Sequence, residues 1–145
     1  MDLQKLSDII EIEQLLARYA VGMSRHDVDT VIDVFAPGGT YSAFGDVYDT
    51  TDFPALMKAA PAGLYSTGTP ALELDGDHGS GYQTLAFTAQ LDHEIRIGYY
   101  TDTYTRTSDG WRLQTRVMTF LRRSGARDSG RHRRRQAVPA VAAAG

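Results

Sequence analysis

The residue with the clearest chemical potential in this chain is Asp102, a carboxylate on a predicted strand otherwise rich in aromatic and β-branched residues. Side chains alternate along a strand, so every second residue shares a face. The face that carries this carboxylate consists of Gly98, Tyr100, Asp102 and Tyr104. If this face is buried, a carboxylate ringed by phenols could act as a general base, and Gly98 would leave room for a ligand.

Two structural roles for Asp102 compete with catalysis. The carboxylate could form an ion pair with Arg116 or Arg96 on a neighbouring strand, or it could face solvent. The outcome depends on which strand face is turned inward, because a shift of one residue in register exchanges the two faces.

Tyrosines form the second group of candidate site residues. A phenol combines an apolar ring with a polar hydroxyl, which suits a hydrophobic ligand that carries oxygen atoms. The candidates are Tyr19, Tyr41, Tyr65, Tyr82, Tyr100 and Tyr104. The competing interpretation is that each ring packs in the core with its hydroxyl at the surface. This second interpretation is favoured most strongly for Tyr19, which lies on the apolar face of a predicted helix.

Other reactive side chains carry weaker signals. Ser24 follows a predicted helix, where it could bind a ligand or act as a local cap, and no nucleophile-elbow pattern surrounds it. The four histidines lack metal-ligand spacing, and the chain has no cysteine. We therefore predict neither a metal site nor a cofactor.

The composition is that of a single globular domain. At 145 residues, with 42% hydrophobic and 10% aromatic residues, the chain is long enough to bury its own core. No apolar run approaches the roughly 20 residues of a membrane span, and the N-terminus shows no signal-peptide pattern. We expect a cytoplasmic protein without membrane contact.

Charge is distributed unevenly along the chain. Residues 122–135 include seven arginines and one aspartate, a local charge of +6, whereas the whole chain carries −3 and the remainder therefore −9. A basic run can bind nucleic acid or an acidic partner, but no aromatic interleaving or binding motif accompanies this one. We predict a domain over residues 1–121 and a basic, mostly disordered tail over residues 122–145, with nucleic-acid binding disfavoured.

Helical periodicity dominates the beginning of the chain. Apolar residues recur at helical spacing over residues 7–23, with Ser7 or Asp8 as the expected N-cap. Asp27 is expected to cap a second helix, whose apolar face ends at Phe35 before the helix-breaking Pro37-Gly38-Gly39.

From residue 40 onward, the pattern changes to strands separated by turn signals. A short strand over residues 40–44 and its partner over 46–48 precede a helix over 53–60, which Asp52 is expected to cap. Four further strands are predicted over residues 69–74, 79–90, 94–107 and 111–121. Helices followed by strands favour an α+β fold in which the helices pack on one face of a twisted, mostly antiparallel sheet.

Four sequence segments, taken in order, form a recognisable set. They are Ile12 to Ala20, His26-Asp27-Val28-Asp29 with Val34-Phe35-Ala36-Pro37, Leu72-Glu73-Leu74-Asp75-Gly76-Asp77, and Tyr100-Thr101-Asp102 through Trp111. They cover about residues 7–121 and resemble the motifs of a SnoaL-like domain of the nuclear transport factor 2-like superfamily. The resemblance implies a cone-shaped curved sheet closed by the N-terminal helices around an apolar pocket. It also implies a homodimer formed through the open sheet face.

The resemblance implies a pocket but no single reaction. The family includes polyketide cyclases, scytalone-type dehydratases, ketosteroid isomerases and epoxide hydrolases, together with binding modules that catalyse nothing. The dehydratase branch has an aspartate and a histidine where this chain has Ser24 and, approximately, Tyr65, so that machinery is absent. The cyclase and isomerase branches use a strand-borne carboxylate as base, and Asp102 falls near the cyclase position. By this comparison Tyr65 would donate a hydrogen bond to a carbonyl or enolate oxygen.

The residues support two functional hypotheses. In the first, the protein is a cofactor-independent cyclase, isomerase or dehydratase acting on a hydrophobic, oxygenated substrate of polyketide, terpenoid or steroid type. In the second, the domain binds a ligand or dimerises without catalysis. The catalytic residues of the first hypothesis are Asp102, Tyr65 and Tyr41, and its ligand contacts are Tyr19, Ser24, Tyr100, Tyr104 and Arg116.

Overall fold

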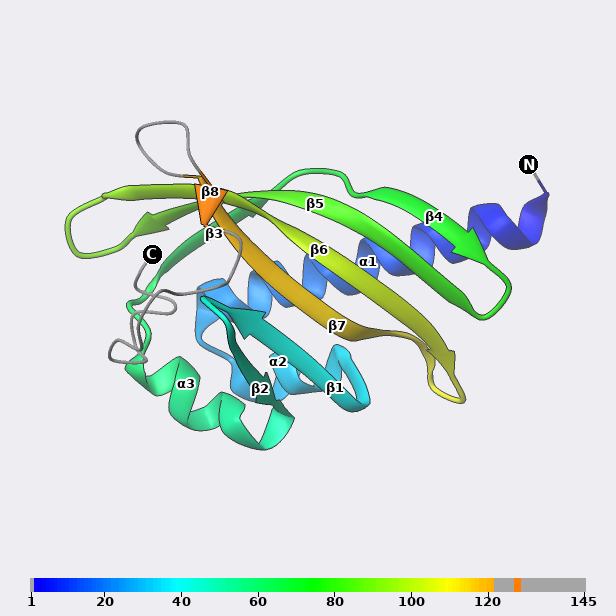
Figure 1. Cartoon of the computed structure of the whole chain (residues 1–145), viewed down its shortest axis with the longest axis horizontal. Coiled ribbons are helices and arrows are strands. Elements are labelled where there is room, and N and C mark those ends of the chain that lie inside the picture. Colours follow the sequence, from blue (N-terminus) through cyan, green and yellow to red (C-terminus); the bar gives the residue numbers. More distant parts are fainter. Residues whose placement is uncertain (1, 122–126, 129–145) are drawn as a thin grey trace.

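A computed structural model describes residues 2–121 and 127–128 of the chain (Figure 1). A long helix lies across one face of a curved sheet, and two shorter helices lie near one edge of that sheet. The helices are α1 (Leu3–Arg25), α2 (Val28–Asp33) and α3 (Phe53–Ala59), the last preceded by a 3₁₀ turn over Thr50–Asp52. The strands are β1 (Phe35–Ala43), β2 (Asp46–Asp49), β3 (Gly63–Thr67), β4 (Ala71–Asp75), β5 (His78–Ala89), β6 (Ile95–Thr107), β7 (Gly110–Leu121) and β8 (Arg127–Asp128).

The strands form one mixed sheet. Its order is β2-β1-β7-β6-β5-β3, with β4 also paired to β5 and β8 paired to β7. Each pairing that the structure describes is antiparallel except that of β1 with β7. The predicted hairpins β4–β5, β5–β6 and β6–β7 are all present. The predicted α+β fold, a curved and mostly antiparallel sheet packed against N-terminal helices, is therefore confirmed.

The predicted basic tail enters the described part of the chain only at Arg127–Asp128. These residues form β8, which pairs with Phe120 and Leu121 of β7. The prediction of disorder otherwise concerns residues that lie outside the described ones. Among the helices that the structure describes, none is both long and apolar enough to cross a membrane.

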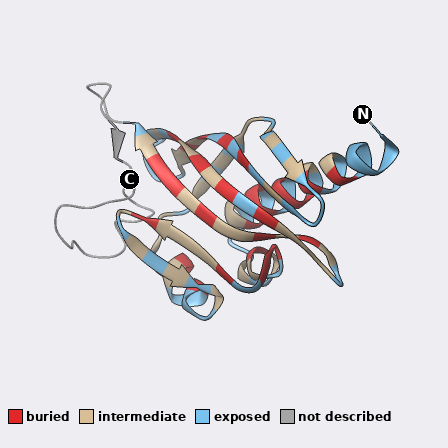
Figure 2. Cartoon of the chain, turned by 45° about the vertical axis from the view of Figure 1, so that its right-hand side comes forward, coloured by how far each residue is buried: buried red, intermediate tan, exposed pale blue. Residues whose placement is uncertain are grey.

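The core lies between α1 and the inner face of the sheet. The α1 residues Ile12, Leu15, Leu16 and Tyr19 are buried and recur at helical spacing, as the sequence predicted. They belong to one continuous cluster with inward residues of β6 and β7. Figure 2 shows buried positions alternating with half-buried and exposed ones along these strands. The apolar face of α1, which repeats at the helical period, thus packs on the sheet face formed by alternate strand residues.

The first helix begins one turn earlier than predicted. Asp2 caps α1 by accepting a hydrogen bond from the Lys5 amide at 2.7 Å, so the prediction of Ser7 or Asp8 as N-cap is wrong. The first turn of α1 is exposed, so it carries no part of the apolar periodicity from which the helix was predicted. Asp8 lies inside the helix instead, and it is buried.

The second and third helices also differ from the prediction. Asp27 caps α2 as expected, but the helix ends at Asp33 and Phe35 begins β1. The β1–β7 register shifts between Phe35 and Thr40, and this irregularity accommodates Pro37, which lacks an amide proton, and Gly38 at φ +79°. Asp52 occupies the N-cap position of α3 as predicted, but its carboxylate makes no capping hydrogen bond there and instead accepts one from the Asp49 amide.

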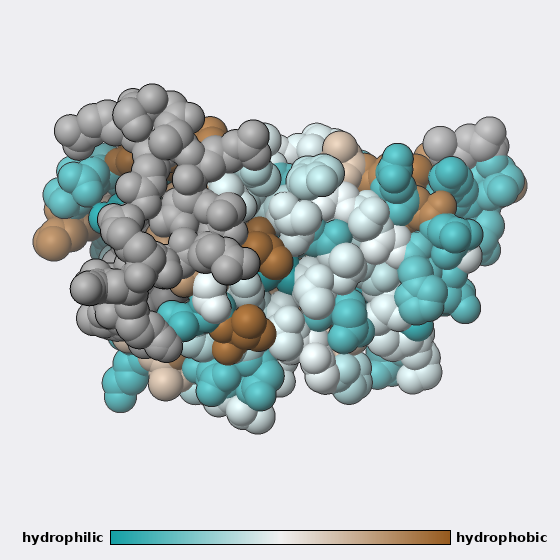
Figure 3. Space-filling model, viewed as in Figure 1, coloured by the Kyte–Doolittle hydropathy of each residue, from teal (hydrophilic) through white to brown (hydrophobic). Residues whose placement is uncertain are grey.

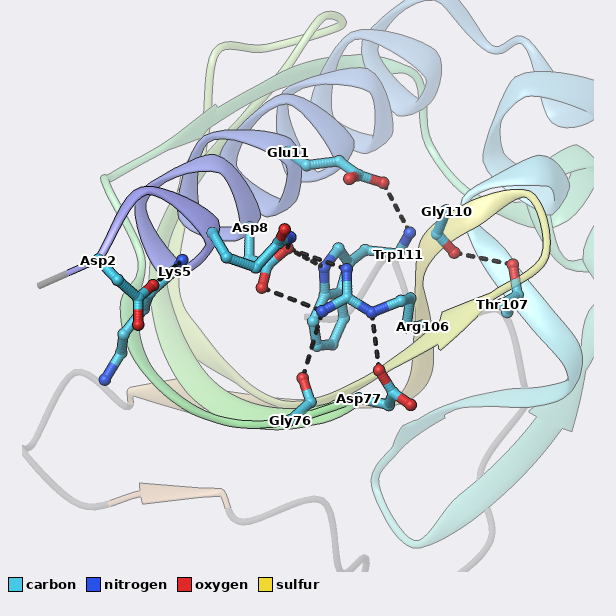
Figure 4. Close-up of polar contacts among 11 residues, drawn as sticks. Asp2, Lys5, Asp8, Glu11, Gly76, Asp77, Arg106, Thr107, Gly110 and Trp111 are labelled. Atoms are coloured by element: carbon cyan, nitrogen blue, oxygen red, sulfur yellow. Dashed lines mark hydrogen bonds and ion pairs between the residues drawn. The ribbon is translucent and has the colours of Figure 1, made fainter.

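Asp8 belongs to a cluster of polar contacts, here called the Asp8 clamp (Asp8, Asp77, Arg106 and Trp111), that fastens α1 to the sheet (Figure 4). Its carboxylate accepts hydrogen bonds from two Arg106 nitrogens, at 2.9 and 3.0 Å, and from the Trp111 indole N–H at 3.1 Å. Arg106 also donates to Asp77 at 2.8 Å. Hydrogen bonding from Arg106 is the main cause that lowers the pKa of Asp8 from 3.8 to about 2.

Replacing this carboxylate should weaken the clamp in a pH-dependent way. We expect Asp8→Asn to lower the free energy of unfolding by about 2 kcal/mol at neutral pH. Because the folded-state pKa lies below the unfolded value of 3.8, the stabilisation is complete above about pH 5 and is lost as the pH falls through about 2. Urea unfolding of both proteins from about pH 2 to pH 7 measures the difference. A gap that stays constant over this range would contradict the role given to the carboxylate.

Candidate functional site

The face of β6 that carries Asp102 is turned into the core. Tyr100, Asp102 and Tyr104 are each 1% exposed, which decides the orientation that the sequence left open. Gly98 is also buried, but there is no open space beside it. A Cβ at this position would collide with the Thr119 carbonyl oxygen and the Met118 side chain. The expectation that Gly98 leaves space for a ligand is therefore wrong, since the neighbouring strand fills that space.

Asp102 and Arg116 form a buried ion pair, the first of the two structural roles that the sequence left open. The Arg116 Nε and Nη2 atoms each donate to one carboxylate oxygen of Asp102 at 2.8 Å. Nη2 also donates to the Gln83 side-chain oxygen at 2.9 Å, and the Tyr104 hydroxyl donates to Asp102 at 3.1 Å. Both charged side chains are 0% exposed. Buried charges are tolerated when they are paired and hydrogen-bonded, and the Asp102 carboxylate meets this condition at both oxygens.

The Arg116 guanidinium also packs against two tyrosine rings. Its Cζ atom lies 3.6 Å from the Tyr100 ring centroid and 4.5 Å from that of Tyr19, distances at which the π face of a phenol attracts a cation. The two rings meet edge to face with their centroids 5.8 Å apart. The remaining nitrogen, Nη1, is buried and has no hydrogen-bond partner among the described residues. Arg116 therefore offers one further donor next to these rings.

A cavity of about 50 Å³ lies beside the ion pair. It is bounded by α1, α2, α3 and the inner face of the sheet, and ten of its fourteen lining residues are apolar. The other four are Tyr19, Tyr41, Tyr65 and Tyr100. Phenol hydroxyls are thus the polar side-chain groups of the lining, which contains no carboxylate, imidazole or guanidinium among the residues described.

The cavity tyrosines are uncharged donors at neutral pH. Burial raises the pKa of Tyr19, Tyr41, Tyr65 and Tyr100 above the ordinary value of 10. The positive charge of Arg116 opposes this rise at Tyr19, Tyr41 and Tyr100. A neutral phenol donates one hydrogen bond and can accept others. The cavity is therefore suited to an apolar molecule that carries at least one hydrogen-bonding oxygen.

The structure divides the predicted site residues into two groups. The residues that line the cavity are Tyr19, Tyr41, Tyr65 and Tyr100. Asp102, Tyr104 and Arg116 form the adjacent buried network and do not line the cavity. Contact between Asp102 and a ligand in the cavity would require this network to open.

Two further candidate residues, Ser24 and Tyr82, lie outside the cavity lining. Ser24 lies in the last turn of α1, where its hydroxyl accepts a hydrogen bond from the Tyr65 amide at 2.9 Å. Ser24 thus joins α1 to β3, and it does not belong to the cavity lining. Tyr82 is 59% exposed on the opposite face of the sheet, so the structure does not place it with the cavity tyrosines.

Sequence reasoning missed Gln83. Its carboxamide accepts from Arg116 through Oε1 and donates through Nε2 to the Gly68 carbonyl oxygen at 2.9 Å. Gln83 shares the inward face of β5 with Leu85 and Phe87, and the alternation of strand side chains was the signal that could have located it. Among the described residues, no group of three or more histidine, cysteine, aspartate or glutamate side chains could hold a metal ion.

The chain is similar to known proteins over most of its length. Residues 4–117 match the family model of the SnoaL-like domain. The chain is 26% identical over 133 residues to the uncharacterized protein Rv2910c of Mycobacterium tuberculosis, covering 82% of this chain and 89% of that protein. Its fold is similar to that of Rv3472 from Mycobacterium tuberculosis, a protein of unknown function (TM-score 0.75, 22% identity, 82% and 75% of the two chains). It is also similar to a hexachlorocyclohexane dehydrochlorinase, LinA type 2 (TM-score 0.74, 13% identity, 94% and 99% of the two chains).

The buried ion pair predicts a strong coupling between its two members. We expect Arg116→Met alone to lower the free energy of unfolding by about 3 kcal/mol or more, because Asp102 stays buried without its partner. Adding Asp102→Leu should recover much of this loss, since neither charge then remains. Urea unfolding of the wild type, both single variants and the double variant measures the coupling. Simple addition of the two single losses would show that the charges do not depend on each other.

Proposed function

Because this chain belongs to the SnoaL-like domain family, matched over residues 4–117, we propose that it is a small-molecule enzyme of acid–base type. Its substrate is a hydrophobic ring compound that carries a carbonyl, hydroxyl or epoxide oxygen. The reaction moves a proton in a cyclisation, isomerisation or elimination, which share this chemistry. The protein requires no bound cofactor for such a step.

The observation that carries the proposal is the apolar cavity whose polar side-chain groups are neutral tyrosine hydroxyls. In the proposed mechanism, Tyr41 and Tyr65 donate hydrogen bonds to the substrate oxygen and stabilise negative charge that develops there. Asp102 is the base that takes the proton from the substrate, and it can do so only when Arg116 or Tyr104, which occupy its oxygens, releases one of them. Three methionines in the lining, Met23, Met57 and Met118, supply flexible side chains that can adjust the small cavity to a ligand.

A binding domain without catalysis is the second candidate. The feature that favours it is the lining itself, in which no described carboxylate or imidazole is in place to remove a proton. Among proteins of the same fold, LinA type 2 is a dehydrochlorinase, which supports the enzymatic alternative by analogy of fold alone. The two candidates differ in one measurable property, the rate at which a bound molecule exchanges protons.

Cyclohexanone is a suitable probe, because it is a small ring ketone whose α-protons exchange with deuterium oxide only after proton removal. We expect the protein to accelerate this exchange, as followed by NMR. Tyr41→Phe and Tyr65→Phe should each slow the accelerated exchange about tenfold or more, since each removes one donor to the developing oxyanion. Tyr82→Phe, on the opposite face of the sheet, is the matched control and should leave the rate unchanged. Binding without accelerated exchange would favour the non-catalytic candidate.

We further propose that the protein is a homodimer joined through the outer face of β5, β6 and β7. This surface, here called the uncharged face, consists of Ser80, Tyr82, Thr84, Tyr99, Thr101, Thr103, Thr115 and Val117. Adjacent strands place Tyr82, Thr101 and Val117 in one row, and Figure 3 shows a broad area of intermediate hydropathy there. Two copies with a strongly acidic body can approach most easily where neither presents a charge.

A single charge at the centre of this face should separate the two copies. In a two-fold dimer, Thr101→Glu places two carboxylates near each other at the interface, which should raise the dimer dissociation constant at least about tenfold. Analytical ultracentrifugation of the wild type and the variant measures this change. Gln90→Glu, in the exposed β5–β6 turn, adds the same charge elsewhere and should have no effect. A wild type that sediments as a monomer at high concentration would disprove the dimer.

A further inference from the structure

We infer that the Asp102–Arg116 ion pair makes the cavity selective for the anionic form of a weakly acidic ligand, such as a ring phenol or an enol. This inference rests on the proposed function in one respect, that the ligand occupies the cavity. It goes further by naming the charge state that the cavity selects and the residue that causes the selection.

The ion pair has a defined orientation relative to the cavity. The guanidinium of Arg116 packs on Tyr100 and Tyr19, at 3.6 and 4.5 Å from the ring centroids, and both tyrosines line the cavity. The carboxylate of Asp102 accepts a hydrogen bond from Tyr104, which does not line it. The positive end of the pair therefore lies nearer to the cavity than the negative end does.

The electrostatic effects on the neighbouring phenols agree with this orientation. Burial is the main cause that raises the pKa of both Tyr19 and Tyr104. At Tyr19, the lowering of the pKa by the Arg116 charge exceeds the raising by Asp102. At Tyr104 the order is reversed, and Asp102 has the larger effect. The cavity side of the pair is thus positive relative to the far side.

The donors that a ligand in the cavity can reach are the tyrosine hydroxyls. Arg116 does not line the cavity, so it acts on a ligand through its positive charge. The cavity tyrosines are neutral and can donate. An anionic oxygen accepts several strong hydrogen bonds at once, whereas a neutral hydroxyl must also donate one. Donors and positive potential together favour a phenolate or enolate oxygen.

The cation is held rigidly in place. Arg116 cannot easily turn toward or away from a ligand, because two of its nitrogens, Nε and Nη2, donate to Asp102 on β6. Nη2 also donates to Gln83 on β5. Gln83 is itself fixed by its bond to the Gly68 carbonyl oxygen. A charge held in place before the ligand arrives stabilises an anion without reorganisation. Gln83 therefore serves as a positioning residue for Arg116.

The probe for this inference is 4-nitrophenol, which absorbs visible light strongly only when it is ionised. A pH titration of the probe with excess wild-type protein gives the pKa of the bound molecule, and the same titration without protein gives the reference. We expect the phenolate to bind about tenfold more tightly than the phenol, as is typical of an acid near an opposite charge. The bound probe should therefore ionise at lower pH than the probe in solution.

Two variants separate this electrostatic role from a structural one. Arg116→Gln removes the cation and should abolish the preference for the phenolate. Asp102→Asn leaves the cation without its counter-charge and should increase the preference. The control is Arg112→Gln, which removes an equal charge on the other face of β7, near Asp33, and should change nothing. Circular dichroism reports whether each variant is folded, and the wild-type titration stands without them.

The outcomes are distinguishable. A preference for the phenolate in the wild type, weakened by Arg116→Gln and strengthened by Asp102→Asn, supports the inference. A bound probe with an unchanged or raised pKa overturns the inference while leaving the proposed function intact, and so does a change in the same direction in both folded variants. If neither 4-nitrophenol nor cyclohexanone binds at all, the proposed function fails with it.

Discussion

The interior of this domain is organised by the constraint that a buried charge must be balanced and hydrogen-bonded. Arg116 of β7 meets this constraint through partners on two other strands, Asp102 on β6 and Gln83 on β5. The register of these strands therefore cannot slip without leaving a charge unpaired. The rings of Tyr19 and Tyr100 cover the guanidinium, which links the helix α1 to the same arrangement. The cavity wall and the buried polar network therefore share Tyr19 and Tyr100, which line the cavity and pack on Arg116.

Much of this arrangement could be predicted from local sequence. The Asp-Gly turn and the two-residue alternation located the hairpin β6–β7 and placed Tyr100, Asp102 and Tyr104 on one face, but only the structure shows that this face points inward. Arg116 was one of two candidate partners for Asp102, because its strand neighbours that of the carboxylate. Four tyrosines expected near a ligand do line the cavity. Strand periodicity thus grouped the residues correctly, whereas the choice between catalysis, an ion pair and solvent exposure for Asp102 required the structure.

The remaining features depend on contacts between distant segments. Asp8 fits an N-cap by local criteria, and only the positions of Arg106 and Trp111 reveal its actual role. Phe35 continues the apolar pattern of a helix, yet it begins β1 because that strand finds a parallel partner in β7. Gln83 is unremarkable in sequence, since its partner Arg116 and its anchor Gly68 lie on different strands or loops. Local propensity carries no information about such partners, and tertiary context overrides it.

The Asp8 clamp also has a consequence for the order in which the chain can fold. Asp8 and Arg106 are separated by 98 positions and Asp8 and Trp111 by 103. During synthesis, α1 leaves the ribosome before the sheet does, and the clamp cannot fasten its N-terminal half until the last long hairpin has emerged. Contacts this distant in sequence slow folding, because a long loop must close before they form. Part of the apolar stripe of α1 therefore stays uncovered until β6 and β7 have formed, which exposes the nascent chain to aggregation more than the folded protein.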